Sequence, residues 1–304
     1  MKLLITGVAG FIGSKIAARA LEQGHEVYGV DDLSKGYESN IPAGVHFIKL
    51  DLSDKSRFHE LPRGVDAIMH LAGQSSGEIS FDDPVADLEK NTVSTLNLIE
   101  YGIATQAKRI VYASSMSVYG GVADADKPVT ETTPCAPLSC YGVGKMASEK
   151  YLEIFKDKLP YTAFRMFSVY GPGQDLTNLR QGMVSIFLQY ALEQGQVPVK
   201  GSLKRFRDFV YIDDVVDAWL GAIQNDRAAN QVFNLGTGVK TTLESLLENM
   251  KKFVPDTTWT EVAGTPGDQF GVCADTSKFK SVFDTKNFKS LNDGLQIFVQ
   301  SCKQ

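Results

Sequence analysis

Short runs of β-branched and aromatic residues alternate along the chain with longer stretches in which apolar residues recur every three or four positions. This alternation is typical of βαβ units, in which helices connect the parallel strands of one sheet. The strand-like runs span 2–6, 26–30, 45–50, 67–71, 109–114, 161–166 and 231–235. The helical stretches span 13–23, 53–60, 84–107, 141–159 and 215–224. We therefore expect an α/β fold built on a doubly wound parallel sheet.

The regular alternation weakens after residue 170, where Gly171, Pro172 and Gly173 interrupt the chain. Clusters of glycine, proline and polar residues recur at 194–204 and 263–271. We expect two domains as a consequence. The sheet domain comprises 1–170 with 205–235, and a second, smaller C-terminal lobe comprises 171–204 and 236–304.

Composition excludes several classes of protein. The 304 residues are 43% hydrophobic, which excludes disorder, and a net charge of −5 gives no general reason to bind nucleic acid. No apolar run approaches the ~20 residues of a membrane span, so we expect no membrane partner. Four cysteines without paired spacing indicate free thiols in a reducing cytoplasm. Four histidines, none spaced as a ligand pair, indicate no metal site.

A glycine-rich loop follows the first strand. Gly7, Gly10 and Gly13 are spaced GxxGxxG, one place different from the usual GxGxxG of dinucleotide-binding proteins. The first glycine permits a sharp turn, the second lets the backbone approach a pyrophosphate, and the third lets the helix pack closely on the strand. The position between a strand and a helix favours a dinucleotide site over a simple tight turn.

Acidic residues end the next two strands. Asp31 and Asp32 stand 18 residues after Gly13, where a carboxylate accepts hydrogen bonds from a ribose and repels a 2′-phosphate. This favours NAD over NADP, the alternative being that Asp31 only begins a loop. Asp51 is placed either to accept from the adenine amino group or to cap the helix at 53–60. Gly73 allows close approach to a cofactor, or closes a turn.

A second candidate site follows the strand at 109–114. Tyr141 and Lys145 are four residues apart, so their side chains lie on the same face of the predicted helix. An ammonium group and a positively charged nicotinamide both favour the phenolate, which makes Tyr141 a candidate proton acceptor and donor. Ser115 is placed to share that proton. Alone, the tyrosine and lysine would indicate a solvated helix face, but the glycine loop and the serine in chain order favour catalysis.

The motifs together resemble the extended short-chain dehydrogenase/reductases, in particular their NAD-dependent nucleotide-sugar epimerase/dehydratase group. The motifs that carry the resemblance are GVAGFIG (7–13), DDLSKG (31–36), DLSD (51–54), HLAG (70–73), SSMSVYG (114–120), YGVGK (141–145), FRMFSVYGPGQ (164–174), RDFVYIDD (207–214) and NLGTG (234–238). The resemblance covers essentially the whole chain. It implies a Rossmann domain that binds NAD and a substrate-binding lobe, which correspond to the two domains expected above.

The resemblance also assigns residues to roles. The implied NAD-binding residues are Gly7, Gly10, Phe11, Ile12, Gly13, Asp31, Asp32, Asp51, Leu52, Leu71, Ala72, Gly73, Asn91, Tyr141, Lys145 and Phe167. The implied catalytic residues are Ser115, Tyr141 and Lys145, and the implied substrate-binding residues are Ser115, Ser168, Arg207 and Val272. Arg207 matches the group's diphosphate-binding arginine, which fits a UDP- or TDP-sugar.

Two positions after Ser115 distinguish the reactions of the group. Dehydratases carry an Asp-Glu pair there, and decarboxylases tend to keep a glutamate at the second place, whereas this chain has Met116 and Ser117. The resemblance therefore implies epimerisation at C4 of UDP-glucose or UDP-N-acetylglucosamine, through a 4-keto sugar and without net redox change. Alternatives are a nucleotide-sugar 4-reductase, another epimerase, and a regulator that senses dinucleotides.

The chain also departs from the group. Ser168 replaces the usual asparagine, and Thr265 replaces a second phosphate-binding arginine, which Arg180 or Arg205 could substitute unless both are solvated surface residues. Val272 replaces a bulky tyrosine and would leave room for an N-acetyl group.

Two expectations concern features outside the site. Asp213, Asp214 and Asp217 resemble a metal cluster, but we expect Asp213 or Asp214 to cap the helix at 215–224. The resemblance implies a homodimer in which the helices at 84–107 and 141–159 pair into a four-helix bundle.

Overall fold

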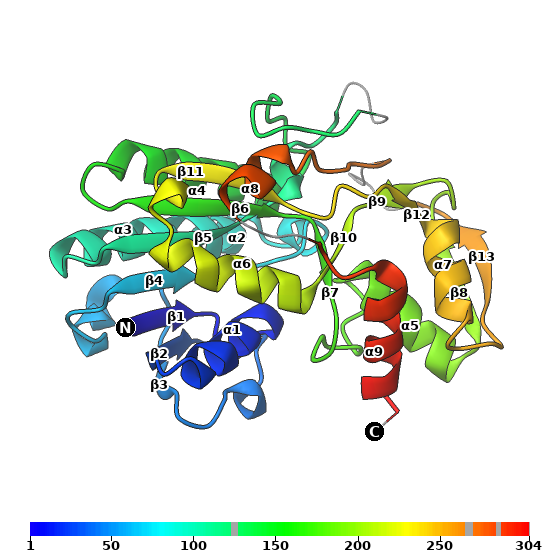
Figure 1. Ribbon diagram of the computed structural model, residues 1–304, viewed down its shortest axis with the longest axis horizontal. Coiled ribbons are helices and arrows are strands. Elements are labelled where there is room, and N and C mark those ends of the chain that lie inside the picture. The colour runs from blue at the N-terminus through cyan, green and yellow to red at the C-terminus, as the bar shows by residue number, and fades with distance from the viewer. Residues whose placement is uncertain (123–126, 265–269, 284–286, 304) are drawn as a thin grey trace.

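The computed structural model describes residues 1–122, 127–264, 270–283 and 287–303. All seven predicted strands pair in parallel in one sheet, in the order β11-β6-β5-β4-β1-β2-β3. Their bounds are β1 (Lys2–Thr6), β2 (Glu26–Asp31), β3 (His46–Lys49), β4 (Ala67–His70), β5 (Arg109–Ser115), β6 (Tyr161–Met166) and β11 (Gln231–Leu235). The predicted α/β fold with a doubly wound parallel sheet is confirmed (Figure 1).

The sheet is buried on both faces, as its near-continuous apolar strands require. Within β1, Leu3 and Ile5 belong to one hydrophobic cluster and Leu4 to the other, because successive side chains of a strand point to opposite faces. The helices α1 (Phe11–Glu22) and α6 (Ile212–Gln224) pack against each other beside the first cluster (Figure 1). On the other face, α3 (Ser94–Ala104) packs against α4 (Cys140–Phe155).

The helix predicted at 84–107 is divided in three. Asp83 caps α2 (Pro84–Leu88) by accepting from the Ala86 N–H at 3.0 Å, and Pro84 occupies the first turn, where its missing N–H is harmless. A π-helical turn, η4 (Glu89–Val93), then leads into α3. Such turns contain one extra residue per turn and recur at functional sites. The spacing of apolar residues, read with the α-helical period of 3.6 residues, does not predict such π-helical turns.

Other helix boundaries also differ from the prediction. The segment at 53–60 is a 3-10 helix (η2, Lys55–Glu60) that Asp54 caps, so Asp51 is not its N-cap. Helix α6 begins at Ile212 rather than 215, which places Asp213 and Asp214 in its first turn instead of at the cap. There the positive end of the helix dipole stabilises their negative charges. Asp214 accepts from the Lys289 N–H at 2.8 Å.

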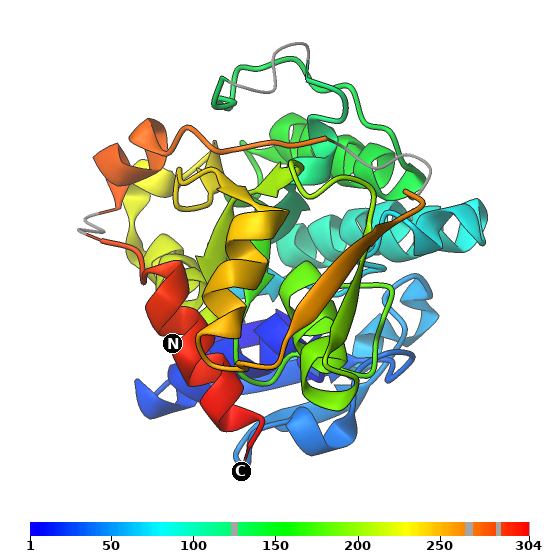
Figure 2. The same cartoon turned by 90° about the vertical axis from the view of Figure 1, so that its right-hand side faces the viewer.

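Further elements lie outside the main sheet, several of them on the side of the molecule that faces the viewer in Figure 2. The strand pairs are β7 (Ser168–Tyr170) with β10 (Phe209–Tyr211), β8 (Gln196–Lys200) with β13 (Thr258–Val262), and β9 (Phe206–Arg207) with β12 (Thr241–Thr242). The helices are α5 (Met183–Glu193), α7 (Leu243–Lys251) and α9 (Leu291–Ser301). The short 3-10 helices are η1 (Glu38–Asn40), η3 (Ile79–Phe81), η5 (Met116–Val118) and η6 (Asp226–Ala228).

The predicted division into two domains stays a prediction. One helix of the segment assigned to the second lobe packs against the main sheet instead. Helix α8 (Ser277–Val282) contacts β11 of the main sheet, and Phe279 packs edge-on against Phe164 and Phe233. Among the described residues, no helix is both long and apolar enough to cross a membrane.

Two helical glycines give a matched test of the packing between strand β1 and helix α1. A Cβ atom on Gly13 would lie 2.1 Å from the Gly7 carbonyl oxygen, whereas one on Gly221 of α6 would lie 3.7 Å from Phe283. Gly13→Ala should lower the free energy of unfolding by about 1–3 kcal/mol, and Gly221→Ala should raise it by up to about 1 kcal/mol. Urea unfolding followed by circular dichroism measures both changes. Equal effects of the two substitutions would contradict the close contact.

Candidate active site

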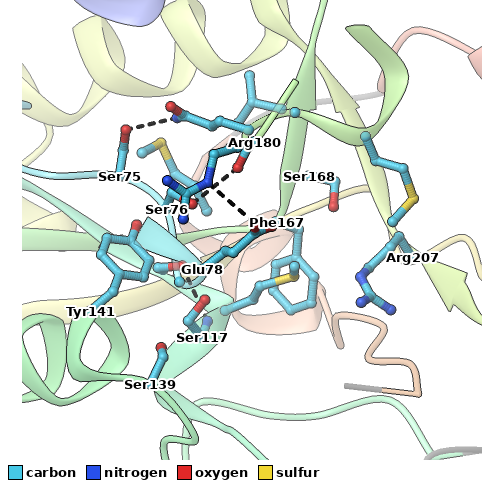
Figure 3. A pocket seen from close by; sticks show the side chains of 18 of the residues that line it. Ser75, Ser76, Glu78, Ser117, Ser139, Tyr141, Phe167, Ser168, Arg180 and Arg207 are labelled. Carbon is cyan, nitrogen blue, oxygen red and sulfur yellow. Dashed lines mark hydrogen bonds and ion pairs between the residues drawn. The ribbon is translucent and has the colours of Figure 1, made fainter. Parts of the chain in front are cut away.

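A cavity of about 410 Å³ lies at the carboxyl edge of the sheet. Its walls come from the start of α1 (Phe11), from the ends of β5 and β6 (Ser115, Phe167), from α5 (Met183) and from β9 (Arg207). In Figure 3, Tyr141 and Arg207 lie on opposite sides of the cavity with Phe167 and Ser168 between them. The strand order reverses between β1 and β4, and ligands of open α/β sheets bind at that edge.

Several bonds join the two sides of the cavity at its rim. The Ser76 hydroxyl donates to the Arg180 carbonyl oxygen at 3.0 Å, and the Gln181 amide donates to the Ser75 hydroxyl at 2.7 Å. The Arg180 guanidinium pairs with Glu78 at 3.2 Å and with Asp82 at 2.7 Å (Figure 3 draws the pair with Glu78). Arg180 is therefore engaged by two carboxylates.

The backbone of the glycine loop turns sharply at Gly7, as the sequence predicts, and packs closely on the backbone of Ala72. Gly7 has a φ of +71°, and a Cβ there would lie 2.8 Å from the Ala72 backbone nitrogen. Gly10 precedes α1 without a side-chain cap, so the first N–H groups of this helix are available to an anion. Since the helix dipole also favours negative charge at this end, the loop fits a pyrophosphate.

Asp31 holds the glycine loop. Its carboxylate accepts from the Ala9 N–H at 3.0 Å and from the Leu33 N–H at 2.9 Å. Burial raises the pKa of Asp31, and the hydrogen bonds from Leu33 and Ala9 oppose that shift. The residue therefore does more than begin a loop, because it connects the end of β2 to the loop that follows β1.

Lys90 links the other two predicted carboxylates. Its ammonium group donates to Asp32 at 2.8 Å and to Asp51 at 2.7 Å. Burial raises the pKa of each carboxyl group, but hydrogen bonds from Lys90 and from nearby serines outweigh burial and leave both values low. The sequence analysis missed Lys90 because no motif contains it. Its position depends on the π-helical turn η4.

Two of the predicted catalytic residues, Ser115 and Tyr141, line the cavity, and Lys145 lies next to Tyr141. Tyr141 is partly buried; desolvation raises its pKa to about 12, and a hydrogen bond with Ser115 opposes the shift. Lys145 is only 4% exposed, and its burial lowers its pKa to about 8. The Lys145 Nζ lies 5.6 Å from the centre of the Tyr141 ring and 5.1 Å from that of Tyr112. A helix that begins with the Ser139 cap presents tyrosine and lysine on one face, as predicted.

Asn91 and Gly73 meet Lys145 on the cofactor side. The Asn91 Oδ1 is buried and has no hydrogen-bond partner among the described residues. A Cβ on Gly73 would lie 2.5 Å from that oxygen and 3.5 Å from the Lys145 Nζ. The buried, unused Asn91 oxygen thus lies beside space that any side chain at Gly73 would fill. A bound group with a hydrogen-bond donor, such as the ribose of a nicotinamide nucleotide, fits this space.

The remaining predicted cofactor residues lie around this edge of the sheet. Phe11 and Ile12 begin α1 and line the cavity. The Leu71 and Ala72 N–H groups donate to the Thr6 hydroxyl at 3.2 and 3.1 Å. Leu52 is buried, and its carbonyl oxygen accepts from Asn97 at 2.9 Å. The predicted cofactor roles of all these residues stay predictions.

The predicted substrate residues do not all reach the cavity. Ser115, Ser168 and Arg207 line it, but Val272 is 1% exposed and packs in a separate cluster with Val118 and Phe167. Thr265 lies outside the described residues. Arg205 is buried rather than a solvated surface residue, and it donates to the Lys200 carbonyl oxygen at 2.6 Å.

A parallel sheet with this glycine loop, and a Tyr–Lys pair at its carboxyl edge, are found together in dinucleotide-dependent enzymes of the short-chain dehydrogenase/reductase class. Residues 3–236 match the profile of the NAD dependent epimerase/dehydratase family. The chain belongs to this family, and its cofactor is NAD.

Individual relatives match most of the chain. A UDP-glucose 4-epimerase of Mycolicibacterium smegmatis is 37% identical over 81% of this chain and 80% of its own. The crystal structure of a UDP-glucose 4-epimerase of Thermotoga maritima with UDP-glucose has a TM-score of 0.94 at 34% identity and covers 100% of this chain and 99% of its own. A CDP-paratose 2-epimerase of Salmonella typhi is 31% identical over 97% of each chain. The family thus includes epimerases of different sugar carbons.

Replacing Lys90 tests its link to the cofactor site. Lys90→Met removes both ion pairs and leaves Asp32 and Asp51 to repel each other, so NAD should bind about 3- to 10-fold more weakly. Lys108→Met is the matched control, since Lys108 pairs with Asp66 at 2.8 Å beside the start of β4, at the opposite edge of the sheet. Isothermal titration of cofactor-free protein measures both affinities. An equal NAD affinity in the two variants would contradict the assignment.

Proposed function

We propose that the protein inverts C4 of a nucleotide-sugar of the UDP-glucose or UDP-N-acetylglucosamine type through a transient 4-keto sugar. The observation that carries this proposal is that Ser115 and Tyr141 line one cavity with Arg207, while the Lys145 Nζ lies 5.6 Å from the centre of the Tyr141 ring. The named activities of the relatives support the substrate class.

In the proposed mechanism, Tyr141 is the group that exchanges the C4 hydroxyl proton. Ser115 donates to or accepts from the same hydroxyl and keeps it in line with the phenol. The Lys145 ammonium stabilises the phenolate, which burial alone disfavours. The chemistry that bound NAD supplies is removal of the C4 hydride and its return to the opposite face of the ketone. Since that cycle has no net redox change, a tightly held cofactor suffices.

The residues after Ser115 support epimerisation over loss of water. Met116 and Ser117 form the 3-10 turn η5 and line the cavity without a carboxyl group. Among the described lining residues, the carboxylate is Glu78, which pairs with Arg180 at 3.2 Å and with Lys200 at 3.7 Å. Both cations hold this carboxylate at the edge of the cavity, and we propose Tyr141 as the acid and base.

The nucleotide end of the proposed substrate lies toward Arg207. This arginine donates to the carbonyl oxygens of Phe206 at 2.7 Å and Phe270 at 3.3 Å, which fixes its guanidinium beside the cavity. A fixed fork of donors suits a diphosphate. Ser168, at the start of β7, contributes a hydroxyl to the same wall. We propose a role for both in diphosphate binding.

We also propose a homodimer in a reducing compartment such as the cytoplasm. Four apolar side chains are exposed on the helices that the family resemblance pairs, namely Val85 and Leu88 of α2 and Val143 and Ile154 of α4. The exposed fractions are 65%, 48%, 48% and 69%, which leaves apolar area for a partner copy to cover. The four cysteines are free thiols, which supports the compartment.

A substrate panel tests the proposed reaction. Purified holoenzyme is incubated with UDP-, TDP-, GDP- and CDP-sugars without added cofactor, and the products are followed by NMR. We expect a 4-epimer from at least one UDP-sugar. Loss of water would indicate a dehydratase, turnover that needs added NADH would indicate a reductase, and inversion at another carbon would overturn the C4 assignment.

Tyr141→Phe should reduce kcat by about 10²- to 10⁴-fold, because it removes the phenol oxygen and little packing. NAD binding should remain close to that of the unmodified protein. Tyr151→Phe, on the same helix α4, is the control and should keep full activity. A Tyr141→Phe variant that retains more than about a tenth of the activity would disprove the proton-transfer role.

A further inference from the structure

One buried carboxylate beside the site has no part in the proposed chemistry. Asp87 belongs to α2, is 2% exposed, and accepts from Gln74 Nε2 at 2.7 Å and from Asn91 Nδ2 at 3.1 Å. Both bonds end on the same oxygen, Oδ1. Burying a carboxylate costs free energy, so the partners and the charge of Asp87 require an explanation.

The first consequence concerns the orientation of the Asn91 side chain. An ionised carboxylate only accepts hydrogen bonds, so the Asn91 amide must present its NH₂ group to Asp87. Its oxygen then points the other way, toward Gly73 and Lys145, where none of the described residues bonds to it. Asp87 thus determines that the cofactor side receives an acceptor rather than a donor.

The second consequence concerns charge. Helix α2 packs against α4, and the ionisable groups of α4 that face Asp87 are Lys145 and Tyr141. Burial lowers the pKa of Lys145, and the charge of Asp87 raises it. Burial raises the pKa of Tyr141, and the charge of Asp87 raises it further. One anion thus shifts both groups in the same direction.

The other ionisable groups around Asp87 are neutral, already paired or exposed to solvent. His70 of β4 bonds to Thr6 and Thr95 at 2.8 and 3.1 Å, and burial lowers its pKa to about 3. Burial raises the pKa of Tyr112 on β5. The remaining charged groups are Lys90, which pairs with Asp32 and Asp51, Glu149, which pairs with Arg165, and the exposed Glu89. The helix η3 (Ile79–Phe81) carries no ionisable side chain.

We propose that Asp87 is a positioning residue, whose carboxylate orients the Asn91 amide toward the cofactor and provides the negative charge that Lys145 and Tyr141 face. The expected effects on kinetics rest on the proposed function. The orientation of Asn91 and the ionisation of Tyr141 do not depend on that function.

Asp87→Asn separates charge from shape, because an amide oxygen still accepts both hydrogen bonds. Activity requires the Tyr141 phenolate together with the Lys145 ammonium, so the two limbs of the pH profile report the pKa values of this coupled pair. Removing the anion lowers both pKa values, so both limbs of kcat/KM should move to lower pH by about one unit. Asp83→Asn removes a charge from the same helix and keeps its cap, so it is the matched control and should leave the profile in place.

Asp87→Ala removes the acceptor as well as the charge. It should shift both limbs in the same way and also weaken NAD binding about tenfold, since the Asn91 amide is no longer oriented. Asp87→Asn should bind NAD within about twofold of the unmodified protein. If Asp87→Asn does not fold, as circular dichroism would show, Asp87→Ala still supplies the pH test.

A spectroscopic titration gives an answer that needs no turnover. The near-ultraviolet absorbance of the Tyr141 phenolate, taken as the difference from Tyr141→Phe, should appear at lower pH in Asp87→Asn than in the unmodified protein. If no sugar reacts but this shift occurs, the proposed function fails and the role of Asp87 stands. Unchanged limbs and an unchanged titration, or a loss of rate without any shift, would overturn the role of Asp87.

Discussion

Strand β1 is hydrogen-bonded in parallel to β2 on one side and to β4 on the other, and the site depends on this arrangement. Because all the strands run in one direction, the chain leaves each of them at the same edge of the sheet. The glycine loop, the acidic ends of β2 and β3, Gly73 and Ser115 therefore meet although they are far apart in sequence. A reversal of one strand would remove its residues from that edge.

Burial sets the chemistry at this edge. Tyr141 and Lys145 are withdrawn from water, which makes the phenol a weaker acid and the ammonium a stronger one. Neither shift favours the phenolate by itself, so the site relies on charges placed nearby. A positively charged cofactor adds one such charge. The protein contributes a second one, the Lys145 ammonium on α4, whose pKa the charge of Asp87 raises.

The sequence predicts the sheet well because each strand is a short apolar run bounded by turn residues. It also predicts the Tyr141–Lys145 pair, since a spacing of four on a helix determines which side chains share a face. It does not predict the ion pairs of Lys90 or the bonds of Asp87, which depend on how three helical segments pack. Nor does it place Val272, whose position depends on how the second lobe folds back over β5 and β6.

The π-helical turn η4 has a consequence for the length of the chain. Within this turn two neighbours serve separate purposes, because Lys90 pairs with Asp32 and Asp51 while Asn91 faces Lys145. Successive residues of a regular α-helix are rotated by about 100°. Deleting one residue between Leu88 and Ser94 would rotate α2 against α3 by about that angle, so that α2 and α3 could not both keep their present packing on α4. Within this segment an insertion or deletion is therefore more damaging than most substitutions, and natural variants should differ there in side chains but not in residue count.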